Sequence, residues 1–149
     1  MFIREYRPHD FPQVEALWKE TGIHTVERGD TNEIIIHCNT LGGKFLVMED
    51  SVTRRVIGTS WLTFDGRRVH LHHFAISPSM QGKGFGRALA LETLEFARQK
   101  ECPLKLEVHK ENHPAINLYK SLGFVIFEDY DVFMIQDPGT LPDSDFSTD

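Results

Sequence analysis

Apolar residues recur along the chain with two different spacings, and these predict which segments are strands and which are helices. Alternating or uninterrupted β-branched and aromatic residues favour strands, whereas apolar residues three or four apart favour amphipathic helices. Glycine, proline and aspartate separate the segments, as expected for turns. The predicted strands span residues 2–7, 45–49, 55–64, 69–76, 104–108, 124–127 and 132–135, and the predicted helices span residues 10–22, 30–41, 87–100 and 112–123.

The helix predicted over residues 30–41 has a competing interpretation. Asp30 and Glu33 have the spacing of a capping box, in which two side chains bind free N–H groups at the start of a helix. The three consecutive isoleucines Ile34–Ile36 are β-branched and also suit a strand. In either case, early antiparallel strands followed by strand–helix–strand units predict a mixed α/β sheet.

The segment Gln81–Gly86 is rich in glycine and lies between a predicted strand and a predicted helix. Backbone N–H groups in such a turn are unpaired and lie at the positive end of the helix dipole, so the turn can bind a phosphate. The alternative is a turn that only reverses the chain. The segment is not a Walker loop, because no Lys-Ser or Lys-Thr pair opens the helix, and Gly82, Gly84 and Gly86 lack the Rossmann spacing.

Two motifs resemble those of the GCN5-related N-acetyltransferase (GNAT) family. Gln81–Gly86 is similar to the family's acyl-CoA motif, (Q/R)-x-x-G-x-(G/A). Asn112–Phe124 resembles the block N-x-x-A-x-x-L-Y-x-x-x-G-F, and the pattern is nearest to that of ribosomal-protein alanine acetyltransferases. The resemblance covers residues 1–136. It implies the GNAT fold, an α/β fold with a mixed, mostly antiparallel sheet of about seven strands and with four helices, followed by a flexible tail over residues 137–149.

The resemblance also implies where the cosubstrate acetyl-CoA binds. Its pantetheine arm is expected in a gap beside the strand 69–76, and its pyrophosphate on the glycine-rich turn. Asn112 is expected to hold cofactor or water, although a residue of this type before a helix is equally suited to be only its cap. The implied cofactor-binding residues are Phe74, Ala75, Ile76, Gln81, Gly82, Lys83, Gly84, Phe85, Gly86, Arg87 and Asn112.

For catalysis, the resemblance implies direct attack of a primary amine on the thioester, without an acyl-enzyme intermediate. Tyr119 matches the family's general acid, which protonates the departing thiolate; a half-buried packing tyrosine is the alternative. The base is open. Glu107 matches ribosomal-protein alanine acetyltransferases, His70 matches histone-type members, and water can replace either. Without the resemblance, Glu107 can equally be a solvated residue at a strand end, and His70 can be a polar residue on an exposed face of the sheet.

Composition narrows the partners and the compartment. A net charge of −6 disfavours nonspecific binding to nucleic acid or to anionic membranes. Cys38 and Cys102 form no disulfide framework and lack metal-ligand spacing, and no carboxylate joins the histidines of the strand 69–76 at such spacing, so no metal is expected. A charged N-terminus, unlike a signal peptide, and the lack of a long apolar run make the cytoplasm the expected compartment. A homodimer is an allowed assembly.

The acceptor amine is expected to enter between residues 23–29 and 128–131, which flank this entrance in the family. Glu27 and the cluster Glu128, Asp129 and Asp131 would then attract cationic acceptors such as polyamines or basic peptides, unless these are only solvated acidic turns. The rival function is a noncatalytic acyl-CoA-binding or regulatory module with the same fold. The tyrosine retained in the second motif favours the enzyme.

Overall fold

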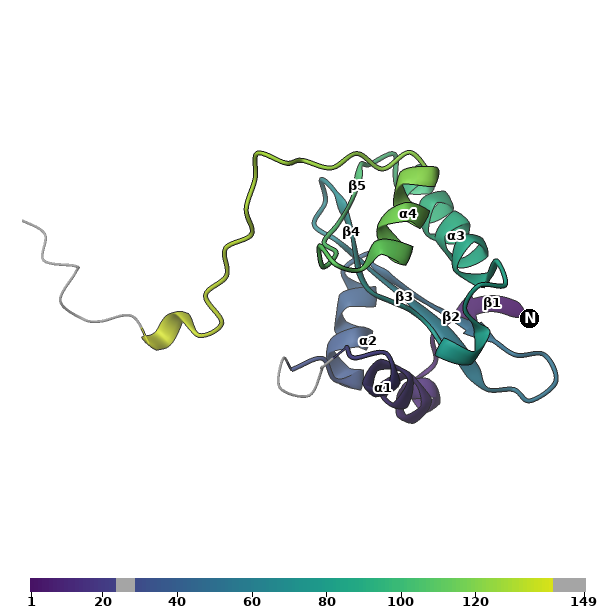
Figure 1. The fold of residues 1–149 in the computed structure, drawn as a ribbon. Coiled ribbons are helices and arrows are strands. Elements are labelled where there is room, and N and C mark those ends of the chain that lie inside the picture. The colour runs from purple at the N-terminus through teal and green to yellow at the C-terminus, as the bar shows by residue number, and fades with distance from the viewer. Residues whose placement is uncertain (24–28, 141–149) are drawn as a thin grey trace, which may run out of the picture.

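A single mixed sheet separates two layers of helices in the computed structural model, which describes residues 1–23 and 29–140 (Figure 1). The strands follow the order β1-β2-β3-β4-β5, in which the first four are antiparallel neighbours and β5 is parallel to β4. Their bounds are β1 Phe2–Glu5, β2 Lys44–Glu49, β3 Val56–Phe64, β4 Val69–Ile76 and β5 Leu104–Leu106. The helices are α1 Phe11–Glu20, α2 Asn32–Thr40, α3 Phe85–Lys100 and α4 His113–Ser121.

Each face of the sheet has its own apolar core. Helices α1 and α2 cover one face, where Trp18 and Ile35 are fully buried against strand residues such as Phe45. Helices α3 and α4 cover the other face, where Leu89 and Tyr119 join a second cluster. Alternate strand residues supply the two cores, because side chains on a strand point to opposite faces in turn.

The second predicted helix is confirmed as a helix, but its cap is not the predicted one. Thr31 precedes the first helical residue, and its Oγ1 accepts a hydrogen bond from the N–H of Ile34 at 3.3 Å. Threonine satisfies a free N–H group at a helix start as well as aspartate does. Asp30 is therefore free to make another contact, and its carboxylate lies against the His73 ring on β4.

The prediction of seven strands is wrong, because the described chain has five. The strands predicted over residues 124–127 and 132–135 do not form, and the chain after α4 runs away from the domain (Figure 1). No backbone group of residues 125–136 bonds to another part of the described chain. A two-stranded hairpin is stable only when it packs on something else, and here it lies apart from the sheet. The strand predicted over residues 104–108 also ends earlier, at Leu106.

A bulge in β4 determines which face each of its side chains occupies. Trp61 on β3 pairs with His72 and Thr59 pairs with Ala75, so two residues of β4 lie opposite one residue of β3. His73, in the bulge, has a φ of +46°, and its carbonyl accepts a hydrogen bond from the Thr59 hydroxyl at 2.9 Å. As a result, both His72 and His73 contact the Trp61 ring on the α1 and α2 face.

Candidate active site

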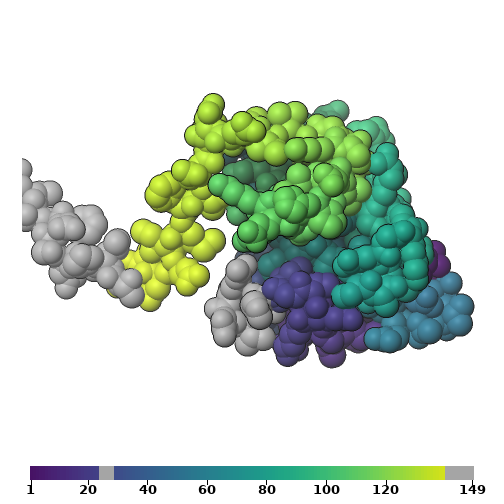
Figure 2. All heavy atoms as spheres, in the orientation of Figure 1, coloured from purple at the N-terminus to yellow at the C-terminus, as the bar shows by residue number. Residues whose placement is uncertain are grey.

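Strands β4 and β5 pair over only three residues and then part. The parallel pairs are Val69 with Leu104, His70 with Lys105, and Leu71 with Leu106, after which β5 ends while β4 continues to Ile76. Beyond Leu71, β4 therefore has β3 as its neighbour on one side and no strand on the other within the described chain. Figure 2 shows a hollow on this side of the molecule, between the green atoms around α4 and the purple atoms of α1.

The glycine-rich turn follows directly at the end of β4. Gly82 and Gly84 have φ of +73° and +85°, a backbone conformation that glycine adopts without strain. A Cβ atom added at either position would meet nothing within 4 Å, so the space above the turn is open. Gly84 caps α3, and the free N–H groups of the first helical turn lie beside it. The turn thus has the conformation and the space that an anion requires.

Gln81 joins this turn to the strand. Its Nε2 donates a hydrogen bond to the carbonyl of Ile76, the last residue of β4, at 2.9 Å. This bond fixes the direction in which the chain leaves the sheet. The Gln81 amide thus bonds to the protein at the base of the turn, and its contact with the cofactor remains a prediction.

The other residues of the motif divide into packing and charged groups. Phe85 packs on the core of the α3 face, and a Cβ atom at Gly86 would lie 3.6 Å from Leu118, so α3 begins close to α4. Arg87 donates a hydrogen bond to Ser121 at the end of α4, at 3.1 Å. Lys83 is exposed, and its ammonium makes only a long contact of 3.9 Å with the Met80 sulfur. Lys83 is therefore available to a phosphate, and so are the other N–H groups of the exposed Arg87 guanidinium.

Tyr119 reaches the gap between the strands from the α3 and α4 face. Its ring lies edge-on to Phe74 of β4, with 6.0 Å between ring centroids, and packs on Phe124. Burial raises the pKa of the phenol to about 12. The described residues provide no hydrogen-bond partner for its hydroxyl. At neutral pH the Tyr119 phenol is therefore protonated, and no described residue accepts a hydrogen bond from it.

The two predicted bases differ in their position relative to the gap. Glu107 is the first residue after β5, is exposed, and alternates with Leu106 and Val108, which pack on the α3 face; its side chain therefore belongs to the opposite face. His70 lies where β4 and β5 are still paired, opposite Lys105, and its Nε2 is 3.6 Å from Asp65. Only Glu107 borders the open part of the gap.

A histidine–aspartate pair lies on the same face, and the sequence did not reveal it. His73 Nε2 and Asp30 Oδ2 are 2.7 Å apart, and the two side chains are only 13% and 17% exposed. Because a carboxylate accepts the hydrogen bond, the proton of the neutral ring lies on Nε2, and Nδ1 has the free lone pair. The two residues are 43 positions apart, and locally Asp30 has the pattern of a helix cap and His73 that of a strand residue.

His72 lies beside this pair but is a weak base. Its Nε2 bonds with the Thr63 hydroxyl at 2.8 Å. Loss of hydration, together with repulsion from His73 and His70, lowers the pKa of His72 to about 4, although the ring is partly exposed and water screens some of this effect. At neutral pH His72 is uncharged.

Asn112 has a structural role that is now visible. Its Oδ1 accepts a hydrogen bond from the N–H of Ala115 at 3.3 Å and so caps α4. Its contact with the cofactor remains a prediction. Residues 24–28, which include Glu27 of the predicted acceptor loop, lie outside the described residues. Glu128, Asp129 and Asp131 are exposed in the segment that leaves the domain, where no hairpin forms, so the structure does not place them at the predicted acceptor entrance.

Several other features bear on what the chain can bind. Among residues 1–23 and 29–140, no three histidine, cysteine, aspartate or glutamate side chains are grouped to hold a metal ion. No helix of the described residues is long and apolar enough to cross a membrane.

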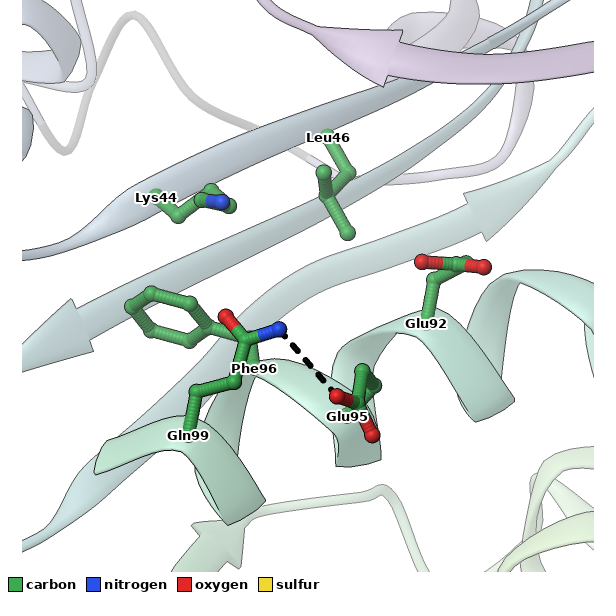
Figure 3. A pocket seen from close by; sticks show the side chains of 6 residues that line it. All are labelled: Lys44, Leu46, Glu92, Glu95, Phe96 and Gln99. Carbon is green, nitrogen blue, oxygen red and sulfur yellow. Dashed lines mark hydrogen bonds between the residues drawn. The ribbon is translucent and has the colours of Figure 1, made fainter. Parts of the chain in front are cut away.

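A small hollow of about 50 Å³ lies between β2 and the later turns of α3, where Glu95 accepts a hydrogen bond from Gln99 (Figure 3). It is far below the roughly 300 Å³ of a typical ligand site, and the glycine-rich turn is at the other end of α3.

Comparison with known sequences identifies the family. Residues 9–124 match the profile of the acetyltransferase (GNAT) family. The chain belongs to this family. Its members are acyl-CoA-dependent N-acetyltransferases with acetyl-CoA as cosubstrate. The predicted family, enzyme class and cosubstrate are therefore confirmed as properties of the family. The predicted α/β GNAT fold with four helices is confirmed as well.

The relatives differ in substrate and in length. A mycothiol acetyltransferase from Thermobifida fusca is 35% identical over 94 residues, which are 56% of this chain and 29% of that enzyme; the chain thus matches less than a third of the length of this curated relative. The Salmonella typhimurium protein yncA, solved with its cofactor acetyl-CoA, has a TM-score of 0.72 at 24% identity, over 85% of this chain and 80% of that one. A ribosomal-protein-alanine N-acetyltransferase from Escherichia coli has a TM-score of 0.69 at 19% identity, over 82% and 76%. Both structures share the fold.

Replacement of Gly84 by valine tests the anion site. We expect Gly84→Val to weaken CoA binding by about 100-fold or more, the equivalent of one or two lost charge-assisted hydrogen bonds, and Lys83→Ala to weaken it by only about 3-fold. Calorimetric titration with CoA measures both. Gly66→Val is the matched control, because Gly66 has the same φ of +85° and equally open surroundings in the turn between β3 and β4. Normal CoA binding by a folded Gly84→Val protein would place the phosphate site elsewhere.

Proposed function

We propose that this chain transfers the acetyl group of acetyl-CoA to a primary amine, of a small molecule or of a peptide N-terminus, by direct attack of the amine on the thioester. The observation that carries the proposal is the parting of β4 and β5 beside the glycine-rich turn. It leaves a stretch of β4 backbone without a strand partner next to an anion-binding helix start. A long thioester with a phosphate end matches both features.

The cosubstrate is positioned by backbone groups on this chain. Its phosphates bind the N–H groups of the turn from Gly82 to Arg87, with Lys83 adding charge. Its pantetheine arm pairs with β4 along Phe74–Ile76, as a further strand would. A backbone N–H group of this stretch polarises the thioester carbonyl and stabilises the oxyanion that forms during attack. This arrangement needs few specific side chains and explains why glycines dominate the motif.

Tyr119 is the general acid in this proposal. When the amine attacks, the tetrahedral species expels the CoA thiolate, which takes a proton from the phenol. The neutral phenol at pH 7, its placement beside Phe74, and its lack of a hydrogen-bond partner in the described chain support the role. The two cysteines are free, and neither lies in the motifs, so the proposal includes no acyl-enzyme.

Glu107 is the general base in this proposal. It borders the open gap, and it lies on the face opposite Tyr119, so the amine can approach from one side while the thiolate leaves toward the other. His70 is the alternative that sequence suggests, and the His73–Asp30 pair is the alternative that the structure adds. Water between the amine and any of these groups can carry the proton.

The acceptor is the open part of the proposal. The relatives include a mycothiol acetyltransferase and a ribosomal-protein-alanine N-acetyltransferase, and these names cover both small and peptide acceptors. Release of free thiol from acetyl-CoA, measured with a panel of amines and N-terminal peptides beside calorimetric CoA binding, tests the proposal. Turnover with any acceptor supports the enzyme. CoA binding without turnover on every acceptor would favour the noncatalytic module.

Removal of the Tyr119 hydroxyl tests the acid. We expect Tyr119→Phe to lower kcat by roughly 10- to 1000-fold, the range of general-acid contributions, with little change in CoA affinity. Steady-state kinetics and calorimetry measure the two effects. Tyr6→Phe is the control and should keep the wild-type kcat, because the Tyr6 hydroxyl bonds to Asn32 and its ring lies in the core of the α1 and α2 face. Wild-type turnover by Tyr119→Phe would leave this residue a packing role only.

A comparison of three variants tests the base. We expect Glu107→Gln to lower kcat about 100-fold, while His70→Gln and His73→Gln each change it less than about 3-fold. Binding of acetyl-CoA should be unchanged in all three, because none of these side chains is in the phosphate turn. If His73→Gln shows the large loss and Glu107→Gln does not, the base is the His73–Asp30 pair instead.

Charge on the acceptor is a further test. The cluster of Glu128, Asp129 and Asp131 leads us to expect that kcat/KM for a cationic amine exceeds that for a matched neutral amine by about 10-fold at low salt. The preference should shrink at high salt and in the double variant Asp129→Asn with Asp131→Asn, because screening and charge removal both weaken the field. Equal values for the two amines would contradict this expectation, as would a preference that ignores salt and the variant.

A further inference from the structure

His73 has a backbone conformation that a residue with a side chain adopts only at a cost. Its φ of +46° lies in the left-handed region, where the Cβ atom crowds the carbonyl oxygen that follows it. Two other described residues besides glycine have positive φ, Arg54 in the turn between β2 and β3 and Glu101 at the end of α3. Of these three, only His73 lies inside a strand. Strain of this kind persists only where neighbouring contacts hold it, and it is common at functional sites.

A hydrogen bond from the neighbouring strand holds this conformation. Thr59 Oγ1 on β3 donates to the carbonyl of His73 at 2.9 Å. The direction of the bond is fixed, because Trp18 Nε1 of α1 donates to the same hydroxyl at 2.9 Å and an indole N–H can only donate. The proton of the Thr59 hydroxyl therefore points to the His73 carbonyl. Thr59 and Trp18 are both 0% exposed, so bulk water does not compete for these bonds.

The bulge determines which backbone groups of the following residues face the gap. Regular pairing would set Phe74 opposite Thr59, but the extra residue sets Ala75 there instead. The hydrogen-bonding groups of successive residues point alternately to the two sides of a strand. The extra residue therefore exchanges the N–H groups that face β3 with those that face the side where β5 has ended.

The bond that holds the bulge does not depend on the side chain at position 73, because it ends on the backbone. The His73 ring makes separate contacts, edge-on to Trp18 with 4.7 Å between ring centroids and with the Asp30 carboxylate at 2.7 Å. A glutamine at this position keeps the carbonyl that Thr59 binds. The small effect expected for His73→Gln therefore agrees with a bulge that Thr59 holds.

We propose that Thr59 is a positioning residue for acetyl transfer. Its hydroxyl, oriented by Trp18, holds the bulge and so directs N–H groups of Phe74–Ile76 to the thioester carbonyl. This inference rests on the proposed function. A donor stabilises the oxyanion well only if it points to the oxygen before the reaction begins. A change in the bulge should therefore slow the chemical step, while the glycine-rich turn binds the phosphates as before.

The first measurement reports on the thioester itself. Infrared difference spectra of bound acetyl-CoA, with an isotope label in the acetyl carbonyl, show how strongly the protein polarises this bond. In the wild type we expect the carbonyl band at a lower frequency than for acetyl-CoA in water. Thr59→Val has the same shape without the hydroxyl and should move the band at least halfway back. Calorimetric affinity for CoA should change by less than about 2-fold, because the phosphates bind elsewhere.

The second measurement is steady-state kinetics. We expect Thr59→Val to lower kcat by about 10- to 100-fold, with the KM for acetyl-CoA within about 3-fold of wild type. Thr59→Ser keeps the hydroxyl and should restore most of both the kcat and the band shift. Thr93→Val is the matched control, because the Thr93 hydroxyl is equally buried and bonds to Ser60 at 2.7 Å, but on the α3 face. It should keep the wild-type kcat and band.

A third replacement covers the case in which Thr59→Val does not fold. In Thr59→Cys a thiol fills nearly the same space and donates only a weak hydrogen bond. Its band and its kcat should both lie below the polarisation and turnover of Thr59→Ser, in a protein of similar stability.

Three results would overturn the role of Thr59. A band that stays at its wild-type position in Thr59→Val or Thr59→Cys would do so and would leave the proposed function intact. A CoA affinity that falls in step with kcat would make Thr59 a residue of the fold alone. Wild-type protein that binds acetyl-CoA without shifting the carbonyl band would contradict polarisation by β4, and the role of Thr59 would fail with that part of the proposed function.

Discussion

The site depends on the point at which the parallel pairing of β4 and β5 stops. Three paired residues hold the strands together, and beyond Leu71 the polar backbone of β4 has a neighbour on one side only. Buried N–H and C=O groups must find partners, so this stretch of strand is prepared to pair with an extended ligand. The glycine-rich turn at the end of β4 continues the same line of donors onto the start of α3.

The bulge at His73 gives the two faces of this strand different chemistry. On one face, Phe74 and Tyr119 form an apolar contact that keeps a phenol protonated. On the other, His72, His73 and the Asp30 carboxylate form a polar surface beside two tryptophans. A strand with regular alternation would not place two successive histidines on one face. The two faces of β4 at this point therefore differ in polarity: one is apolar around the Tyr119 phenol, and the other has titratable side chains.

Short motifs in the sequence predicted the features of the fold that depend on neighbouring residues only. The glycine-rich turn at the end of β4 and the helix that follows it, predicted over residues 87–100 and observed as α3, follow from spacing within short motifs. Contacts between distant residues leave no such pattern: the bond between Asp30 and His73, 43 positions apart, was hidden because each residue also suits a local role. The final strands were predicted from their alternation of side chains, but a strand forms only by pairing with another strand, and residues 125–136 pair with no other described segment.

The shortness of β5 gives the catalytic domain an uneven local stability. β3 is paired along most of its length on both sides, whereas β5 is held by three pairs on one side, so we expect β5 to open at a lower free-energy cost than β3. A ligand that pairs within the gap binds only the state in which β5 is paired with β4. Binding therefore lowers the population of the state in which β5 is detached. The strand with the fewest backbone pairs would in this way be the one that the cosubstrate orders, and the stability of this wall of the site would depend on the concentration of cosubstrate.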